Sequence, residues 1–339
     1  MFKNDYSQIA HPRILQALLN AQSETNDSYG LDIHSMRAKE YIKNVFGSDN
    51  LDIHFLVGGT QANLTVISYI LRDYEGVLAC STGHINVHET ASIEVSGHKI
   101  YQVPGFNGKV RPCDIEQALK VNNNEHMVKI RMVYISNSTE IGTIYQKEEL
   151  KELYEFCHSH GLYLFIDGAR LGVALTAQEN DLTPNDIVKY SDVFYIGGTK
   201  NGLMLGEAVV IVNDELKQDF RYQIKSRGAM LAKGFVNGIQ FEEIFKDGLY
   251  FAIAKLTNEM ADLLKKGLDK RKIERLPSPT NQIFISLPRK IAEKISEEFG
   301  CELWEDHDTS QQIRLVTSFM TTEDEIDAFF KRLDELIAK

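Results

Sequence analysis

Two residues with complementary chemistry each follow an apolar run that is typical of a buried strand. Asp167 comes directly after Leu162–Ile166, and Lys200 comes shortly after Val193–Ile196. The carboxyl ends of parallel strands meet at one edge of a sheet, so we expect the two side chains to lie close together. A lysine can form a Schiff base with an aldehyde, and an aspartate can keep a pyridine nitrogen protonated. The pair therefore predicts pyridoxal 5′-phosphate (PLP) as the cofactor.

Either residue alone has an ordinary structural explanation. An aspartate at a strand end is usually a helix cap, and a single lysine is usually solvated. The residues before Lys200 do not fit that explanation, since Gly197 and Gly198 permit close approach of the backbone and Thr199 can donate to a phosphate. We therefore favour the cofactor interpretation for the pair.

The segment from Gly58 to Asn63 ends the first predicted strand and opens a predicted helix. A helix N-terminus carries a partial positive charge and free N–H groups, so it binds phosphate readily. We expect Thr60 to be the N-cap, and Gly59 and Thr60 to be the main donors to the cofactor phosphate. The alternative is a glycine-rich turn before a capped helix, because the segment matches neither a dinucleotide-binding fingerprint nor a P-loop.

Two histidines, His84 and His88, follow the second predicted strand and would share one face of a helix. A metal site would need a third ligand, which the neighbouring sequence does not supply, so we expect no metal. We expect His84 to stack on the pyridine ring, with His88 and Glu89 further along the pocket wall. The alternative is a core or capping histidine.

Two arginines are candidates to bind a carboxylate. Arg170 comes three residues after Asp167 and can reach the cofactor hydroxyl or a substrate carboxylate. Arg314 stands inside the otherwise apolar run Ile313–Thr317, where a buried cation needs a partner. The planar guanidinium binds a carboxylate with two parallel hydrogen bonds, which suits an amino-acid substrate. The alternative for Arg314 is a partly exposed position on an edge strand.

The composition is that of an ordinary globular protein and limits its partners and its location. Hydrophobic residues make up 43% and charged residues 25% of the 339 residues, and the net charge is −11. The sequence has no clustered basic stripe, so we expect no nucleic-acid partner. Four scattered cysteines, no apolar signal segment and no run long enough to span a bilayer favour a cytoplasmic protein without a membrane partner.

Short apolar runs alternate with segments of helical character over the first two thirds of the chain. The expected strands are Ile53–Val57, Gly76–Cys80, Lys99–Val103, Met132–Ser136, Leu162–Ile166, Val193–Ile196 and Ala208–Val212. The expected helices between them are Thr60–Arg72, Asp114–Lys120 and Lys147–Ser159. This alternation predicts an α/β domain with a mostly parallel seven-stranded sheet, and most of the candidate residues above follow a strand.

The pattern changes after about Phe241. Phe241–Leu268 is expected to form a long helix with a break near Gly248, which leads into a second region. The elements expected there are a strand at Gln282–Leu287, a helix at Arg289–Phe299, a strand at Gln312–Thr317 and a helix at Thr322–Ile337. We therefore predict a large domain over residues 1–245 and a small C-terminal α+β domain over residues 246–339.

Several of these segments together resemble a known family. They are Asn26–Asp32, Gly58–Asn63, His84–Glu89, Asp167–Arg170, Thr199–Lys200 and Arg314–Thr317. The chain is similar to the β-eliminating lyase and threonine aldolase group of fold-type I (aspartate aminotransferase-like) PLP enzymes. The Asp-Gly-Ala-Arg and Thr-Lys stretches are the most specific of them. The resemblance runs over nearly the whole chain.

The resemblance implies a role for each matching residue. Lys200 would carry the cofactor, Asp167 would bind its pyridine nitrogen and His84 would stack on its ring. The implied phosphate ligands are Gly59, Thr60 and Thr199, and the implied carboxylate ligands are Arg170 and Arg314.

Three further residues have roles that the resemblance implies. His126 would lie near the substrate side chain, and Lys225 would approach the cofactor pocket of a neighbouring subunit. Asn4 takes the position of a serine that touches the substrate carboxylate in the relatives. The family forms homodimers or homotetramers with shared active sites, and we expect the same here.

The sequence departs from the family pattern at three places. Asn4–Tyr6 replaces a Ser-Asp-Thr stretch, Ser136–Glu140 replaces Glu-Asn-Thr-His-Asn, and Asn201-Gly202 replaces Gly-Leu after the lysine. These changes fall around the substrate and leave the cofactor ligands unchanged.

The expected activity is cleavage of the Cα–Cβ bond of a β-hydroxy-α-amino acid, such as threonine or allo-threonine, into glycine and an aldehyde. The base that takes the hydroxyl proton could be His84, His88 or a water molecule. The alternative activity is β-elimination on an aromatic or thiol-bearing amino acid, as in tryptophanase and tyrosine phenol-lyase. A third alternative, a binding protein that has lost catalysis, is disfavoured because both Lys200 and Asp167 are present.

Overall fold

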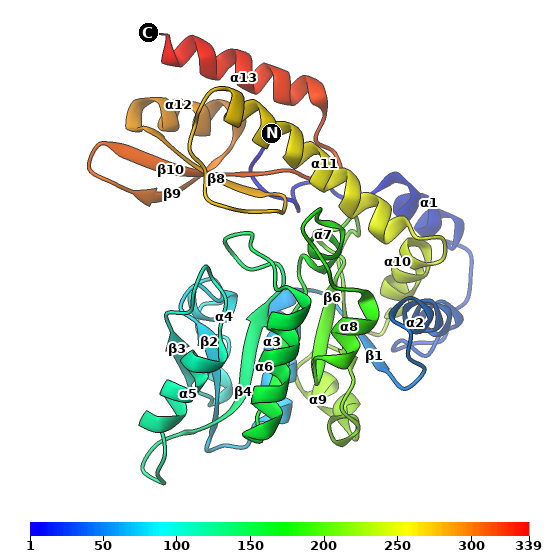
Figure 1. Cartoon of the computed structure of the whole chain (residues 1–339). Helices are drawn as coiled ribbons and strands as arrows, with labels where there is room; N and C mark the ends of the chain where they lie inside the picture. Colours follow the sequence, from blue (N-terminus) through cyan, green and yellow to red (C-terminus); the bar gives the residue numbers. More distant parts are fainter. Residues whose placement is uncertain (339) are drawn as a thin grey trace.

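A seven-stranded sheet forms the centre of the larger part of the molecule (Figure 1). The computed structural model describes residues 1–338. In spatial order the strands are β1 (Asp52–Leu56), β7 (Glu207–Ile211), β6 (Val193–Gly197), β5 (Tyr163–Asp167), β4 (Lys129–Ser136), β2 (Glu75–Cys80) and β3 (Ile100–Val103). Only β7 runs against its neighbours, so the sheet is mostly parallel, as predicted.

The inner strands of the sheet are largely buried because both of its faces are covered. Successive residues of β6 show this, since Phe194 and Ile196 pack in one core while Val193 and Tyr195 pack in the other. The helices over these two faces are α1 (Pro12–Asn20), α2 (Ile33–Phe46), α3 (Gly59–Ile70), α4 (His84–Val87), α5 (Pro112–Val121), α6 (Lys147–Ser159), α7 (Leu171–Thr176), α8 (Pro184–Lys189), α9 (Phe220–Ser226) and α10 (Phe235–Phe245).

Glycines stand at two helix ends for which the sequence made a prediction. The long helix expected from Phe241 is divided into α10 and α11 (Leu249–Lys270), and Gly248 between them has a φ of 79°, which confirms the break. Thr60 was expected to be an N-cap, and this is wrong. Helix α3 begins one residue earlier, with Gly58 as an N-cap that offers no side-chain hydrogen bond.

A second, three-stranded antiparallel sheet lies above the first in Figure 1. Its strands are β8 (Gln282–Pro288), β10 (Ser310–Val316) and β9 (Glu302–Asp306), and it packs with α11, α12 (Arg289–Phe299) and α13 (Glu323–Ile337). The sequence did not predict β9. It is an edge strand with four of its five residues exposed, so it lacks the apolar run by which the other strands were recognised.

The two parts of the molecule share a helix and the N-terminal segment. Helix α11 starts in the core of the large sheet, at Leu249 and Tyr250, and ends in the core of the small sheet, at Leu264 and Leu268. Phe2 is fully buried in that second core. The division into residues 1–245 and 246–339 stays a prediction.

The longest helices of residues 1–338 are amphipathic or charged. None of the described helices is both long enough and apolar enough to cross a lipid bilayer.

Candidate active site

A cavity of about 270 Å³ opens at the carboxyl ends of the parallel strands. Its walls come from the segments after β1, β2, β4, β5 and β6, together with the first residue of β7. Seven of the residues predicted from the sequence line it: Gly59, Thr60, His84, Asp167, Arg170, Thr199 and Lys200.

Asp167 is the last residue of β5 and is buried at the base of this cavity. Its carboxylate accepts hydrogen bonds from the hydroxyls of Tyr134 and Tyr195, each at 2.5 Å, and from the Asn63 amide at 3.2 Å. Burial acts to raise the pKa of Asp167. The charge of His84 and the two tyrosine hydrogen bonds outweigh this effect and hold the pKa below its ordinary value. A carboxylate that stays ionised can keep a bound pyridine nitrogen protonated.

Lys200 follows β6 in a loop that needs both of its glycines. A Cβ atom on Gly197 would lie 2.2 Å from the carbonyl oxygen of Ala169, and one on Gly198 would lie 2.6 Å from the carbonyl oxygen of Gly206. Gly197 therefore lets the ends of β5 and β6 approach closely, and Gly198 lets the loop fold against the residue before β7, which brings Lys200 and Asp167 into one cavity. Burial and the neighbouring Arg170 guanidinium lower the pKa of the lysine ammonium, which favours the neutral, nucleophilic amine.

The residues predicted to hold phosphate also meet in this cavity. Gly59 and Thr60 are the first two residues of α3, where a helix leaves backbone N–H groups without partners. Gly59 is tightly placed, because a Cβ atom there would lie 2.9 Å from the Tyr195 hydroxyl. Thr199 lies on the opposite loop. A helix N-terminus, a lysine and an ionised aspartate in one cavity are a donor set that fits PLP.

His84 is the first residue of α4 and is held in place by carboxylates on two sides. Its Nδ1 lies 2.8 Å from Oε1 of the buried Glu89, and its backbone N–H donates to Glu140 Oε1 at 2.9 Å. Glu89 also accepts from the Asn63 amide at 2.7 Å. Since Asn63 donates to Asp167 as well, one network orients both the predicted stacking group and the predicted pyridine ligand.

A second cavity of about 290 Å³ adjoins the first and contains His88 and Arg314. The two cavities share five lining residues, which are Tyr6, His84, Glu140, Arg170 and Lys200. Arg314 projects from β10, over the ring of Trp304 at 4.8 Å, and pairs with Glu302. Its Nε is buried and has no hydrogen-bond partner among the described residues. Together the cavities form a continuous site with a cofactor end and an arginine end.

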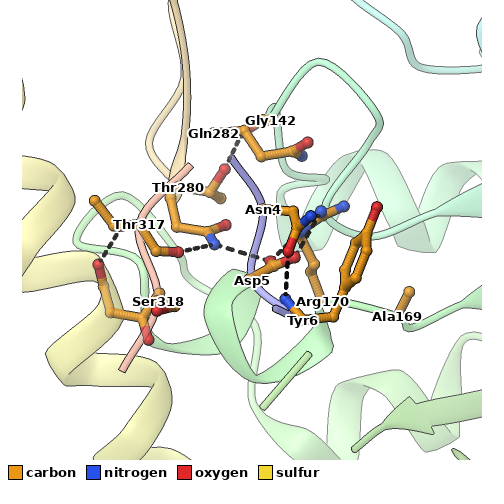
Figure 2. A network of polar contacts seen from close by, with 12 residues as sticks. Asn4, Asp5, Tyr6, Gly142, Ala169, Arg170, Thr280, Gln282, Thr317 and Ser318 are labelled. Carbon is orange, nitrogen blue, oxygen red and sulfur yellow. Dashed lines mark hydrogen bonds and ion pairs between the residues drawn. The ribbon is translucent and has the colours of Figure 1, made fainter. Parts of the chain in front are cut away.

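Arg170 also lines both cavities, but its guanidinium already has a carboxylate partner. Its Nε and one terminal nitrogen donate to the two oxygens of Asp5 at 2.7 and 3.0 Å. Figure 2 shows this pair, in which Asp5 belongs to the N-terminal segment. The Asn281 amide bridges Asp5 at 3.0 Å and the Thr317 carbonyl at 2.8 Å, which ties the segment to the small domain. Arg170 is therefore less available to a substrate than expected.

The Asn4 side chain bonds within its own segment, and its expected contact with the substrate carboxylate stays a prediction. Its side-chain oxygen accepts from the backbone N–H of Tyr6 at 3.0 Å and from the Ser7 hydroxyl at 2.8 Å, which closes a local turn (Figure 2). Asn4 lines neither cavity, whereas Tyr6 lines both.

His126 and Lys225 lie apart from the grouped residues. His126 is exposed and precedes β4, so it lies at the opposite edge of the sheet. The eight residues of β4 span roughly 26 Å, so His126 lies far from the cavities of its own chain, and its expected place near the substrate side chain stays a prediction. Lys225 is near the end of α9, with its Nζ 4.9 Å from the centre of the Tyr29 ring. Its expected contact with a neighbouring subunit stays a prediction.

Sequence reasoning missed three acidic residues that the fold brings to the site. Asp5 binds Arg170, Glu140 lines both cavities, and Glu207 lines the cofactor cavity and accepts from the Gly198 N–H at 3.0 Å. Burial raises the pKa of Glu207 to about 8. Asp5 and Glu140 fall within two of the stretches where the chain departs from its relatives. For Glu140 the departure itself is the signal that could have identified it, whereas Asp5 keeps the aspartate of the Ser-Asp-Thr stretch.

No metal site is seen in the part of the chain that the structure describes. Among residues 1–338, no group of three or more His, Cys, Asp or Glu side chains is arranged to hold a metal ion. His84 and His88 lie beside each other, with ring centres 5.4 Å apart.

The fold and the paired Asp167 and Lys200 define a PLP-dependent enzyme of fold type I. The structure of aspartate aminotransferase from Thermus thermophilus with maleate has the same fold, with a TM-score of 0.71 at 15% identity over 99% of this chain and 90% of that one.

Comparisons with known proteins identify the family within that class. The profile described as Beta-eliminating lyase matches residues 8–291. The low specificity L-threonine aldolase of Pseudomonas sp. is 30% identical over 265 residues, which cover 77% of this chain and 75% of that protein. A solved structure of Leishmania major threonine aldolase is 44% identical over 99% of both chains, with a TM-score of 0.97. The chain belongs to the β-eliminating lyase family.

Proposed function

We propose that the protein is a threonine aldolase, which cleaves a β-hydroxy-α-amino acid such as threonine or allo-threonine into glycine and an aldehyde. The observation that carries the proposal is the continuous site, with Asp167 and Lys200 at one end and Arg314 at the other. The relatives described as threonine aldolases support it, because one of them covers nearly the whole chain at 44% identity.

Each part of the cofactor would have ligands in the first cavity. Lys200 would hold its aldehyde carbon, Asp167 its pyridine nitrogen, and His84 would cover its ring. Gly59, Thr60 and Thr199 would hold its phosphate. When bound, PLP supplies an electron sink for the bond that breaks at Cα.

The small domain would then select which bond breaks. Arg314 is placed to bind the substrate carboxylate in the second cavity while the substrate amine lies near Lys200. Fixing these two groups determines which of the remaining bonds at Cα stands perpendicular to the ring, and only that bond is weakened. Tyr6 from the N-terminal segment lines both cavities and would contact a substrate that spans them.

An assay panel tests the proposed activity. We expect purified protein to release glycine and acetaldehyde from L-threonine, and to release no pyruvate from tryptophan, tyrosine or cysteine. Lys200→Ala should abolish the reaction and the absorbance change on borohydride treatment, since Lys200 is the amine in reach of the cofactor aldehyde. Pyruvate release without glycine release would support β-elimination in place of the proposed reaction.

We further propose that the protein is a cytoplasmic homodimer or homotetramer with shared active sites. The location is supported by four cysteines without disulfide partners, of which Cys113 is exposed. Exposed apolar side chains on large-domain helices and their flanking residues, including Leu31, Ile33, Met36 and Tyr222, support an interface between copies.

A further inference from the structure

Glu140 lies where the two cavities of the site meet. It belongs to the loop that follows β4 and lines both the cofactor cavity and the cavity of Arg314. One carboxylate oxygen, Oε1, accepts from the backbone N–H of His84 at 2.9 Å and from the Ser136 hydroxyl at 2.6 Å. No described residue donates a hydrogen bond to the other oxygen, Oε2. The side chain is thus anchored through one oxygen while the other stays available.

The loop that carries Glu140 is fixed by bonds from both domains. The Asn137 side-chain oxygen accepts from the Tyr145 N–H at 3.2 Å, and the Gln282 amide of β8 donates to the Thr139 carbonyl at 3.1 Å. Thr139 also donates its N–H to the Thr143 carbonyl at 2.8 Å. A carboxylate held in this way needs little rearrangement when a substrate binds, which is a requirement for catalytic groups.

Charged and titratable groups face Glu140 from every side of the site. Helix α4 contributes His84 and His88, and β5 contributes Asp167. The remaining groups are Arg170 after β5, Lys200 after β6, Tyr6 from the N-terminal segment, and Glu302 and Arg314 from the small domain. Lys200 and Arg314 are the residues proposed to lie beside the substrate amine and carboxylate. The reacting Cα–Cβ bond would then lie between these two residues, beside Glu140.

We propose that Glu140 is a catalytic residue that accepts the proton of the substrate's β-hydroxyl group. The inference rests on the proposed threonine cleavage. The hydroxyl O–H bond breaks and its proton moves to Oε2, and the oxygen electrons form the aldehyde C=O bond. The Cα–Cβ bond breaks at the same time and leaves its electron pair at Cα. Cα then takes up a proton to give glycine, so the net reaction moves one proton from oxygen to carbon.

Two comparisons favour Glu140 over the histidines as this base. Nδ1 of His84 is occupied by Glu89, and the ring is the group proposed to cover the cofactor. His88 lines only the second cavity, whereas Glu140 lines both. Burial lowers the pKa of His88, and the charges of His84 and Arg314 add to this effect, so His88 is a weaker base than an ordinary histidine. Burial raises the pKa of Glu140, and the nearby charge of Asp167 also raises it, which makes this carboxylate a stronger base than usual.

The test compares Glu140→Gln with the wild-type holoenzyme. Glutamine keeps an oxygen for the His84 N–H but cannot accept a proton. We expect kcat/KM for L-threonine to fall roughly 100- to 10,000-fold, the usual contribution of a general base. The wild-type profile should lose activity as the pH falls through a pKa above the ordinary glutamate value, and this limb should be absent from the residual activity of the variant. Glu140→Asp should recover part of the rate.

Binding measurements separate a catalytic role from a structural one. We expect Glu140→Gln to bind PLP, measured by quenching of Trp304 fluorescence, and L-2-aminobutyrate, measured by cofactor absorbance, within about threefold of wild type. L-2-aminobutyrate lacks the β-hydroxyl group of threonine, so the enzyme cannot cleave it. Glu148→Gln, a matched change at an 81% exposed side chain, should match wild type in every measurement.

Three results would overturn the proposal. They are an unchanged kcat/KM in Glu140→Gln, a loss of 2-aminobutyrate or PLP binding as large as the loss of rate, or an acid limb that persists unchanged in the variant. If wild-type protein releases no glycine from threonine, the proposed function fails and this inference fails with it. Cleavage by wild type with an unaffected variant would reject Glu140 alone.

Discussion

The two arginines of the site differ in how firmly each is already paired. The partner of Arg170 is Asp5, whose side chain is fully buried, whereas the partner of Arg314 is Glu302, whose side chain is 43% exposed. A partly exposed carboxylate can turn into water at small cost, while a buried one would be left without compensation. Arg314 is therefore the arginine that can exchange its partner for a substrate carboxylate.

Replacement of Arg314 should separate substrate binding from stability. Loss of a charge-assisted pair costs about 2–4 kcal/mol, so we expect Arg314→Ala to lower kcat/KM for L-threonine by roughly 30- to 1,000-fold. Arg314→Lys should recover only part, because an ammonium lacks the planar fork. The melting temperature should change little, since Glu302 becomes solvated. Both quantities are measured on the same preparation.

A control in the same domain makes this result specific. Arg289 is 41% exposed and pairs with Asp306 away from both cavities, so Arg289→Ala should leave kcat/KM unchanged. Normal kinetics in Arg314→Ala together with a lower melting temperature would mean that Arg314 only supports the packing of β10.

At the scale of elements, the junction of β5 and β6 positions the chemistry. A Cβ atom on Gly197 would meet the backbone of Ala169, at 2.2 Å from its oxygen and 2.6 Å from its carbonyl carbon. The backbone cannot move away as a flexible side chain could, so the ends of the two strands would have to separate. Lys200 and Asp167 depend on this contact for their shared cavity.

Gly197→Ala should therefore reduce both stability and cofactor binding. Overpacking of a well-packed site typically costs about 1–3 kcal/mol, and we expect a loss in this range or above, with a weaker PLP affinity. Gly58→Ala is the matched control for stability, because a Cβ atom there has no neighbour within 4 Å and its φ of −173° is open to any residue. Urea unfolding of both variants measures the difference. Equal midpoints for Gly197→Ala and wild type would show that the strand ends adjust freely.

The elements most readily predicted from the sequence are those that are buried on both faces. All seven strands of the large sheet were predicted, with bounds that agree to one residue except at the start of β4, because most of them are short apolar runs. Strand β9 was missed because Trp304 is its only residue that is not exposed. Helix α10 was expected to begin at Phe241 but begins at Phe235, since no strong signal marks its start at Gly234.

The parts of the site that could not be predicted are contacts between distant segments. Asp167, Lys200 and Thr60 follow strands, so the sheet alone brings them together. Asp5 meets Arg170 across 165 residues, through a segment whose course depends on the burial of Phe2 in the small domain. No periodicity or local motif encodes such a contact.

The whole molecule brings the two cores together around the site. The N-terminal segment connects them. The backbone of Phe2 forms hydrogen bonds with Phe299 and Val316 of the small domain, whereas Asp5 binds Arg170 of the large sheet's part and Tyr6 lines the cofactor cavity. Four acidic residues come together with the cations there, at Asp5, Glu140, Asp167 and Glu207. Folding must therefore remove several charges from water at once, and the free energy of unfolding depends on which of them are protonated.

Glu207, together with Glu140, whose pKa burial also raises, should lower stability as the pH rises between about pH 5 and pH 8. Burial raises the pKa of Glu207 to about 8 in the folded chain, whereas an unfolded glutamate titrates near about 4.3. Between these values the folded state holds a proton that the unfolded state releases, so the free energy of unfolding falls as the pH rises.

The aspartates and the lysine act with the opposite sign. The hydrogen bonds and charges around Asp5 and Asp167 lower the pKa of each carboxyl against the effect of burial, so the stability from these groups is lost only as the pH falls below about 4. Burial lowers the pKa of Lys200, so stability from that group rises with pH from the lowered value towards about 10.4. We therefore expect the urea midpoint of cofactor-free protein to decrease from pH 5 to pH 8, and Glu207→Gln to reduce that slope. Glu148→Gln, at an exposed glutamate, should keep the wild-type slope. An equal slope in Glu207→Gln and wild type would mean that Glu207 is already ionised in the folded protein, with Lys200 as its charged partner.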